Sequence, residues 1–229
     1  MSFLQSKSKK DYIDFKEFIA EFTVNSIPQD AEQYIRIIHK NLFNIHFFKY
    51  SIKIDDVYLK ETISDLLSFA FLSRLGTHKA AMVVLRSSIE NFIRYIVNSY
   101  LNREELIQST LVLPLFEESK KYFDSHSIVI NHIDKLYSNY SFLCSYSHSA
   151  LVDFQEQNLV FSDLLVFNTT EIKKSSRECE KTVNSMLTIL YYFYYIIDKK
   201  NSSIILSDYR SEFVELIPSE ILEILTPPL

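Results

Sequence analysis

Apolar side chains recur every three or four residues through most of this chain, which is the spacing of one face of an α-helix. The first stripe begins at Asp11 and ends near residue 24. A second stripe opens at Pro28 and Asp30 and continues to Tyr50, since proline is favoured in the first turn of a helix. Both segments are therefore predicted to be helices, and the first should be peripheral.

The middle of the chain carries its own start and stop signals. Asp55 or Asp56 can cap a third helix, and Gly76, the single glycine of the chain, can end it. Thr77 can then cap a fourth helix that extends to about Leu101. These signals predict two consecutive long helices joined by a short turn.

The second half of the chain is less uniform. Residues 102–124 include a proline and a charged stretch and predict short helices and a connector. Ser127 restarts a long helix that runs to about Ala150. The segment 153–168 fits either a helix or a strand, because short apolar runs do not separate the two.

The last long helix should begin at Thr169 or Thr170, either of which can cap it. It is apolar nearly all round from Met186 to Ile197, so it should lie in the centre of a bundle. Residues 207–225 predict one or two short helices packed on the outside.

Composition narrows the fold class. Tight β-hairpins need residues with positive φ, usually Gly or Asn-Gly, and the chain has one glycine in 229 residues. The fold class is therefore all-α, a helical bundle of about five long helices with short peripheral ones. We expect a single domain over residues 1–229, with its core between about residues 28 and 200.

Charge and cysteine usage exclude several classes of protein. The net charge of −5 argues against DNA binding, which rests on clustered Lys and Arg. Cys144 and Cys179 have no spacing typical of a disulfide framework. The beginning of the chain lacks a signal-peptide pattern, and its longest apolar run is shorter than the ~20 residues of a membrane span. We expect a cytoplasmic protein with no membrane contact.

One line of charged residues follows the core stripe of the fourth helix. Arg86, Glu90 and Arg94 are four residues apart, so they share one face beside buried positions. Part-buried charges are normally paired and hydrogen-bonded. Arg86 and Glu90 are therefore predicted to form a structural ion pair or to belong to a functional site, with the structural alternative favoured.

The helix that begins at Ser127 carries a histidine among hydroxyl groups. His148 is expected to share its surroundings with Tyr140, Ser141 and Ser145, which can fix its tautomer. Either a packing role or an acid–base role fits such a residue. No spacing of His, Cys or acidic residues requires a metal, a single glycine excludes a phosphate-binding loop, and no cofactor is expected. His78, near a predicted helix start, is expected to be exposed.

Two motifs together resemble the HEPN superfamily of helical bacterial proteins. They are Arg86-Ser-Ser-Ile-Glu90 and Ser145-Tyr-Ser-His148, which match an Arg-x-x-x-Glu helix followed by a Ser-x-x-His helix. The resemblance covers roughly residues 66–151. It implies a helical bundle, often dimeric, from a superfamily of toxins, phage-defence factors and metal-independent RNases.

The active nucleases of that superfamily carry an Arg and the catalytic His on one helix, with four to six residues between them. Here Ser141, Phe142 and a leucine occupy the corresponding positions before His148, so the standard nuclease arrangement is missing. The favoured hypothesis is a non-catalytic interaction or regulatory module of a phage-defence or toxin–antitoxin system, acting as a homodimer or with a partner protein. One alternative is an RNase in which His148 transfers protons and Arg86 holds the phosphate, so RNA remains a candidate ligand. Another is an unrelated helical adaptor or small-ligand binder.

Overall fold

The computed structural model describes residues 3–21, 28–148, 167–198 and 215–225, and every regular element in these ranges is helical. The helices, in order, are α1 (Phe3–Ala20), α2 (Glu32–Ile52), α3 (Val57–Leu75), α4 (His78–Ile96), η1 (Val97–Leu101), α5 (Glu104–Ile107), α6 (Leu113–Tyr122), α7 (Ser127–His148), α8 (Thr169–Tyr192), η4 (Phe193–Ile197) and α10 (Ser219–Leu225). The segments η1 and η4 are π-helical. The all-α prediction is thus confirmed for the described residues.

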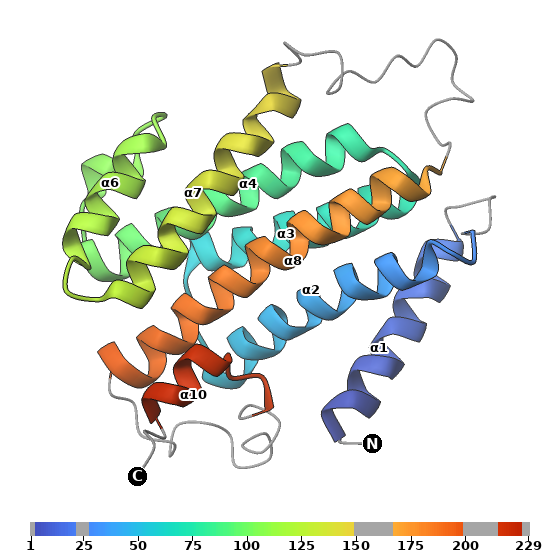
Figure 1. The fold of residues 1–229 in the computed structure, drawn as a ribbon, viewed down its shortest axis with the longest axis horizontal. Coiled ribbons are helices and arrows are strands. Elements are labelled where there is room, and N and C mark those ends of the chain that lie inside the picture. Colours follow the sequence, from blue (N-terminus) through green and yellow to red (C-terminus); the bar gives the residue numbers. More distant parts are fainter. Residues whose placement is uncertain (1–2, 22–27, 149–166, 199–214, 226–229) are drawn as a thin grey trace.

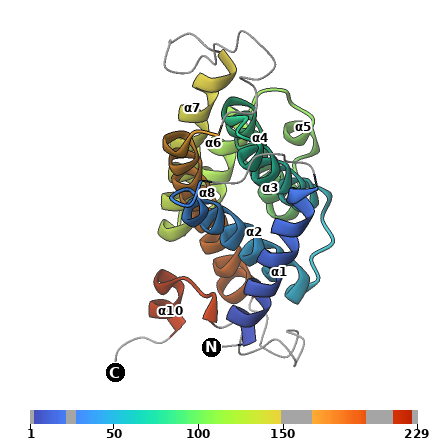
Figure 2. The same cartoon turned by 90° about the vertical axis from the view of Figure 1, so that its right-hand side faces the viewer.

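The long helices pack around α8. Figure 1 shows α8 between α2 and α7, and α8 also packs against α4. Helix α3 packs on α4 and α2, and α6 packs on α7. Helices α1 and α10 lie at the edge of the bundle, as Figure 2 shows from the side. Both helices were expected to be peripheral.

The central position of α8 follows from its sequence. Every residue from Ser185 to Tyr194 is buried, which confirms the prediction made from its continuous apolar run. One cluster of buried side chains joins α8 to the other long helices and reaches Tyr12 on α1 and Ile221 on α10. Burial of this apolar surface is the main force that holds the bundle together.

The first helix begins earlier than predicted. It starts at Phe3 rather than at Asp11, because Leu4 is buried against Phe43 and Phe47 of α2. The lysine-rich residues between Leu4 and Asp11 hide this extension from a periodicity argument. Tertiary packing therefore extends the helix where the local pattern is polar.

The cap of α3 agrees with the prediction, whereas the caps of α4 and α8 differ from it. The Asp56 side chain accepts hydrogen bonds from the backbone N–H groups of Tyr58 (2.8 Å) and Leu59 (3.0 Å), and Gly76 ends α3 with φ of 81°. Thr77 occupies the N-cap position of α4, as predicted, but its side chain makes no capping bond, because its hydroxyl donates to the Leu72 carbonyl at 3.0 Å. Nor does a threonine cap α8.

The cap of α8 is Asn168, one residue before the predicted threonines. Its side-chain oxygen accepts from the N–H groups of Thr170 (2.9 Å) and Glu171 (3.3 Å). Asparagine at the N-cap leaves Thr169 and Thr170 in the first turn. The prediction was therefore wrong by one position.

The irregular region 102–124 contains α5 and α6, as predicted. Residues 153–166 of the segment that fits helix or strand, and residues 207–214, lie outside the described parts. Among the described helices, none is both long enough and apolar enough to cross a membrane.

Candidate functional site

Arg86 joins α4 to α7. Its Nη1 donates to the Tyr140 hydroxyl at 3.2 Å and lies 3.9 Å from the Cys144 sulfur. The guanidinium carbon also stands 5.4 Å from the centre of the Tyr140 ring, a cation–π distance. Burial raises the pKa of Tyr140 to about 12, against an opposing effect of Arg86, so this phenol stays protonated at neutral pH. These contacts bring Arg86 of α4 and Tyr140 of α7 together.

Glu90 pairs with Arg94 rather than with Arg86. Arg94 Nη2 lies 2.9 Å from Glu90 Oε1, one helical turn away. Arg94 also donates to the backbone carbonyls of Ile107 and Ser109, the latter at 2.9 Å. Within the described chain, no ion pair joins Arg86 to Glu90. The three charged residues share one helix face, as predicted, but they have different partners. Arg86 contacts Tyr140, whereas Arg94 binds Glu90 and the backbone carbonyls of Ile107 and Ser109.

The remaining candidates lie along α7. Ser141 is exposed and Ser145 is half-buried, close to the end of the helix. His148 is the last residue of α7, and its side chain is outside the described atoms. The structure therefore brings Arg86 and Tyr140 together and leaves the position of the His148 imidazole open.

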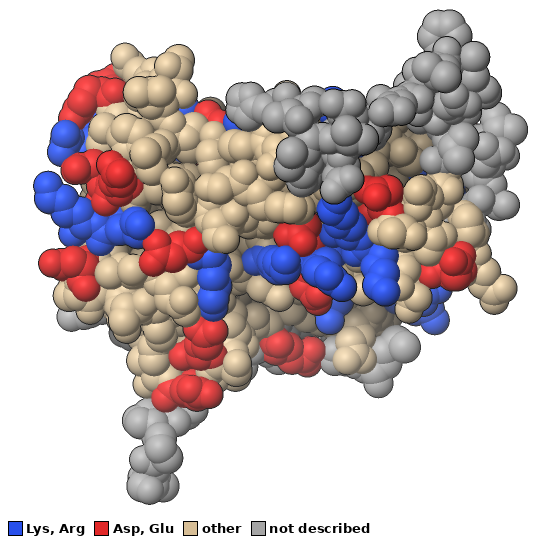
Figure 3. Space-filling model, turned by 45° about the horizontal axis from the view of Figure 1, so that its top comes forward, with Lys and Arg blue, Asp and Glu red and all other residues tan. Residues whose placement is uncertain are grey.

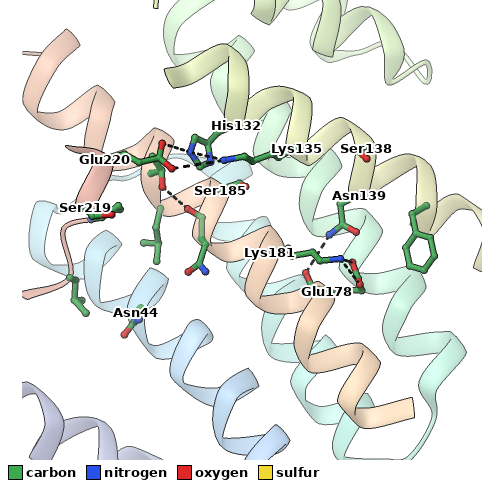
Figure 4. Close-up of a pocket in the computed structure, with 16 residues that line it drawn as sticks. Asn44, His132, Lys135, Ser138, Asn139, Glu178, Lys181, Ser185, Ser219 and Glu220 are labelled. Carbon is green, nitrogen blue, oxygen red and sulfur yellow. Dashed lines mark hydrogen bonds and ion pairs between the residues drawn. The ribbon is translucent and has the colours of Figure 1, made fainter. Parts of the chain in front are cut away.

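A polar groove lies between α2, α7, α8 and α10 (Figure 4). The part of α7 that lines it falls within residues 132–142. Its volume is about 860 Å³, within the range of small-molecule sites. Three amides, Asn44, Asn139 and Asn184, share the lining with hydroxyl groups and two lysines. Sequence analysis missed this groove, because its walls come from segments far apart in the chain.

The end of the groove beside α10 is held by a histidine–carboxylate contact. His132 Nε2 donates to Glu220 Oε2 at 3.0 Å, and Lys135 Nζ lies 3.9 Å from Glu220 Oε1. Burial lowers the pKa of His132 despite the Glu220 carboxylate, so the ring is neutral at pH 7. The hydrogen bond from His132 lowers the pKa of Glu220. These contacts fasten α10 to α7.

The floor of the groove is formed by α8. Lys181 Nζ lies 2.9 Å from Glu178 Oε1, and the Asn139 amide donates to the Thr182 hydroxyl at 2.5 Å. With His132 neutral, two lysines and two glutamates balance the charge of the lining. The groove therefore suits a polar ligand with little net charge.

Outside the groove, the face drawn in Figure 3 carries charged side chains of both signs. On the face drawn in Figure 3, a group of Lys and Arg side chains is flanked by Asp and Glu side chains. On α8, Lys173 and Arg177 are exposed, whereas Lys174 lies 5.2 Å from the centre of the Tyr146 ring. This basic segment is a solvated helix face in which Lys174 lies over two rings, those of Phe142 and Tyr146.

A Ser–His–Glu arrangement at the start of α8 was not foreseen. Ser175 Oγ lies 2.7 Å from His78 Nδ1, and His78 Nε2 lies 2.5 Å from Glu171 Oε2. His78 is 11% exposed, so the prediction that it is exposed was wrong. Ser175 is fully buried, and the adjoining cavity of about 10 Å³ has room for one water. The trio therefore ties α4 to α8 and leaves no space for a substrate.

Comparison with known protein families, with curated proteins and with solved structures finds no match to this chain. In the described part of the chain, no three His, Cys, Asp or Glu side chains are grouped as metal ligands. The candidate sites are therefore the Arg86–Tyr140 contact and the polar groove.

Proposed function

We propose that this chain is a non-catalytic, HEPN-like interaction or regulatory module of a bacterial phage-defence or toxin–antitoxin system, located in the cytoplasm. The observation that supports the proposal is that the side chains of Arg86 and Glu90 are bound to other residues of the helical bundle. Arg86 is held by the hydroxyl and ring of Tyr140, and Glu90 is held by Arg94. A phosphate-binding arginine directs its donors at its ligand, whereas Arg86 Nη1 donates to the Tyr140 hydroxyl of α7 and Arg94 donates to the carbonyls of Ile107 and Ser109.

An RNA-cleavage assay tests the absence of catalysis. Purified protein is incubated with RNA in EDTA, alone and with the product of the neighbouring gene, and no cleavage is expected. Arg86→Lys and His148→Ala serve as matched variants. Cleavage by the wild-type protein that either variant abolishes, with the melting temperature unchanged, would establish the RNase alternative instead.

The module is proposed to act as a homodimer or with a partner protein. Large apolar side chains are exposed beside and on α6, including Leu111 (66% exposed) and Leu113 (48% exposed). Apolar surface of this kind favours association when it is contiguous. Val57, 65% exposed at the start of α3, offers a control position of similar character.

Light scattering measures the assembly directly. The wild-type protein should show a dimer mass, or co-purify with a defined partner when the two genes are expressed together. Leu111→Glu with Leu113→Glu should abolish this association, whereas Val57→Glu should leave it intact. A monomer mass at micromolar concentration with no stable partner contradicts the proposal.

A second candidate function is the binding of a small polar ligand, which the volume and polar lining of the groove favour. Asn139 lines the groove and is bonded to Thr182 and to the Glu178 carbonyl. Native mass spectrometry of freshly purified protein should then detect a retained small molecule. Ser138→Phe should fill part of the groove and remove that mass, whereas Ser141→Phe, exposed one turn away, should not.

A further inference from the structure

The segment that leads into α10 forms one wall of the polar groove. Four residues of this wall line the groove: Leu216, Pro218, Ser219 and Glu220. The wall is attached to the bundle by two buried isoleucines, Ile217 and Ile221, and α10 packs on α8. The hydrogen bond between His132 and Glu220 adds a polar attachment. The groove therefore keeps this wall only while α10 is docked.

Leu216 also contacts the place where α1 docks. Leu4 of α1 is buried against Phe43 and Phe47 of α2, in a small cluster separate from the main core. Leu216 packs on this cluster. Figures 1 and 2 both show the beginning of α1 at the same edge of the bundle as α10. One side chain therefore belongs both to the wall of the groove and to the surface on which α1 rests.

The two terminal helices are attached by the same kind of polar contact. His39 Nε2 of α2 lies 2.8 Å from Asp11 Oδ2 of α1, and this contact matches the one between His132 and Glu220. Both imidazoles are buried, whereas both carboxylates are partly or fully exposed. Helix α1 packs mainly on α2 and α10 mainly on α8, while each central helix packs on two or more neighbours. Elements with few packed neighbours open at a lower free-energy cost than the core, so α1 and α10 should undock before the bundle unfolds.

We propose that α1 controls the polar groove through Leu216. Docked α1 completes the cluster on which Leu216 packs, so release of α1 removes apolar contact from Leu216 and loosens α10. The loosened wall then opens the groove to solvent. Coupling of this kind is reciprocal, so release of α10 also loosens α1. As a control of ligand access, this inference rests on the second candidate function, the binding of a small polar ligand in the groove.

Hydrogen exchange in two α1 variants tests the coupling. Leu4→Ser removes the contact within the cluster, and Asp11→Leu removes the partner of His39. Asp11 lies outside the cluster, so its effect on α10 must pass through the docking of α1. Both variants should accelerate exchange in α1 and, by about fivefold or more, in the amides of α10. Asp14→Leu, at an exposed carboxylate on the same helix, should leave α10 unchanged.

The result that overturns the proposal is faster exchange in α1 with no change in α10. If neither single variant accelerates exchange in α1, the double variant decides in the same way. Unchanged exchange in α1 of the double variant also overturns the proposal, because Leu4 and Asp11 would then not hold the helix. Glu220→Leu tests the reciprocal direction and should accelerate exchange in α1.

A thiol in the groove reports its opening. Ser185 is buried and lines the groove, so the thiol of Ser185→Cys should react slowly with a thiol reagent in the folded protein. Adding Asp11→Leu should speed its modification about fivefold or more, measured by mass spectrometry of the peptide that contains it. Adding Asp14→Leu instead should not, and equal rates in the two combinations overturn the proposal. These measurements need no ligand, so failure of the coupling is distinguished from failure to find a retained molecule.

Discussion

Arg94 is expected to be the most important charged residue for the stability of the α4–α5 region. Its guanidinium bonds Glu90 and the carbonyls of Ile107 and Ser109, and its side chain is only 12% exposed. Arg94→Leu removes all three interactions at once. It leaves two backbone acceptors and a carboxylate without this partner.

The magnitude follows from the burial of these groups. Hydrogen bonds to a charged group contribute about 1.5–3 kcal/mol each when buried, and loss of one partner of a buried pair costs about 3–5 kcal/mol. Glu90 is 23% exposed, so water replaces part of the loss. We therefore expect Arg94→Leu to lower the free energy of unfolding by about 2–4 kcal/mol. For a chain of this size the melting temperature should fall by about 5–15 °C.

Two further variants isolate the effect. Glu90→Gln keeps a hydrogen-bond acceptor for Arg94 and should cost about 1 kcal/mol. Arg36→Leu removes an arginine that is 65% exposed and has a glutamate one turn away, so it should cost about 1 kcal/mol or less. Urea unfolding followed by circular dichroism at 222 nm measures all three. In Arg94→Leu, hydrogen exchange should also accelerate in residues 104–109.

The reasoning fails if Arg94→Leu and Arg36→Leu cost the same within error, because Arg94 would then act as an ordinary surface charge. It also fails if Glu90→Gln lowers the free energy of unfolding more than Arg94→Leu does. In that case the carboxylate, rather than the two carbonyls, would be the main partner that Arg94 serves.

Three other predictions follow from the described contacts. The pKa of His132 is lowered in the folded state, so the unfolded chain binds more protons as the pH falls, and the docking of α10 should weaken below about pH 6.5. The pKa of Glu220 is also lowered from its usual value of 4.5, so protonation of this carboxylate below pH 4.5 should weaken the docking further. Hydrogen exchange of the α10 amides measures this, and His132→Asn should remove the loss nearer neutral pH. A thiol reagent should modify Cys144 in the folded protein and Cys179 only in denaturant, because Cys179 is buried and burial raises its pKa. Asn168→Ala should destabilise the protein by about 1 kcal/mol in urea unfolding, whereas an unchanged midpoint would mean that the cap contributes nothing.

Most of the helices were predictable because their signals are local. Asp56 and Gly76 act within one turn of the ends they define, and the continuous apolar run of α8 requires burial on all sides. The early start of α1 was not predictable, since it depends on Leu4 meeting Phe43 across two helices. Local patterns identify elements, but long-range contacts determine where some of them begin.

Candidate residues were harder to predict than helices. Periodicity placed Arg86, Glu90 and Arg94 on one face, but it does not indicate which pairs form. The Arg94 bonds go to backbone carbonyls, which every residue has and no sequence pattern marks. The groove was also unpredictable, because it forms only when α10 packs against α7 and α8.

The π-helical turns η1 and η4 show why the contact between Tyr100 and Asp198 could not be found from periodicity. A π turn closes one residue later than an α turn, so it rotates the side chains that follow by about 100° relative to the preceding stripe. In Met186–Ile197 the run is apolar nearly all round, and a rotated stripe therefore looks the same as a regular one. Asp198 is the first charged residue after the run, and its place beside Tyr100 depends on that rotation. Side chains at the two π turns are thus brought together by backbone geometry that composition and spacing do not encode.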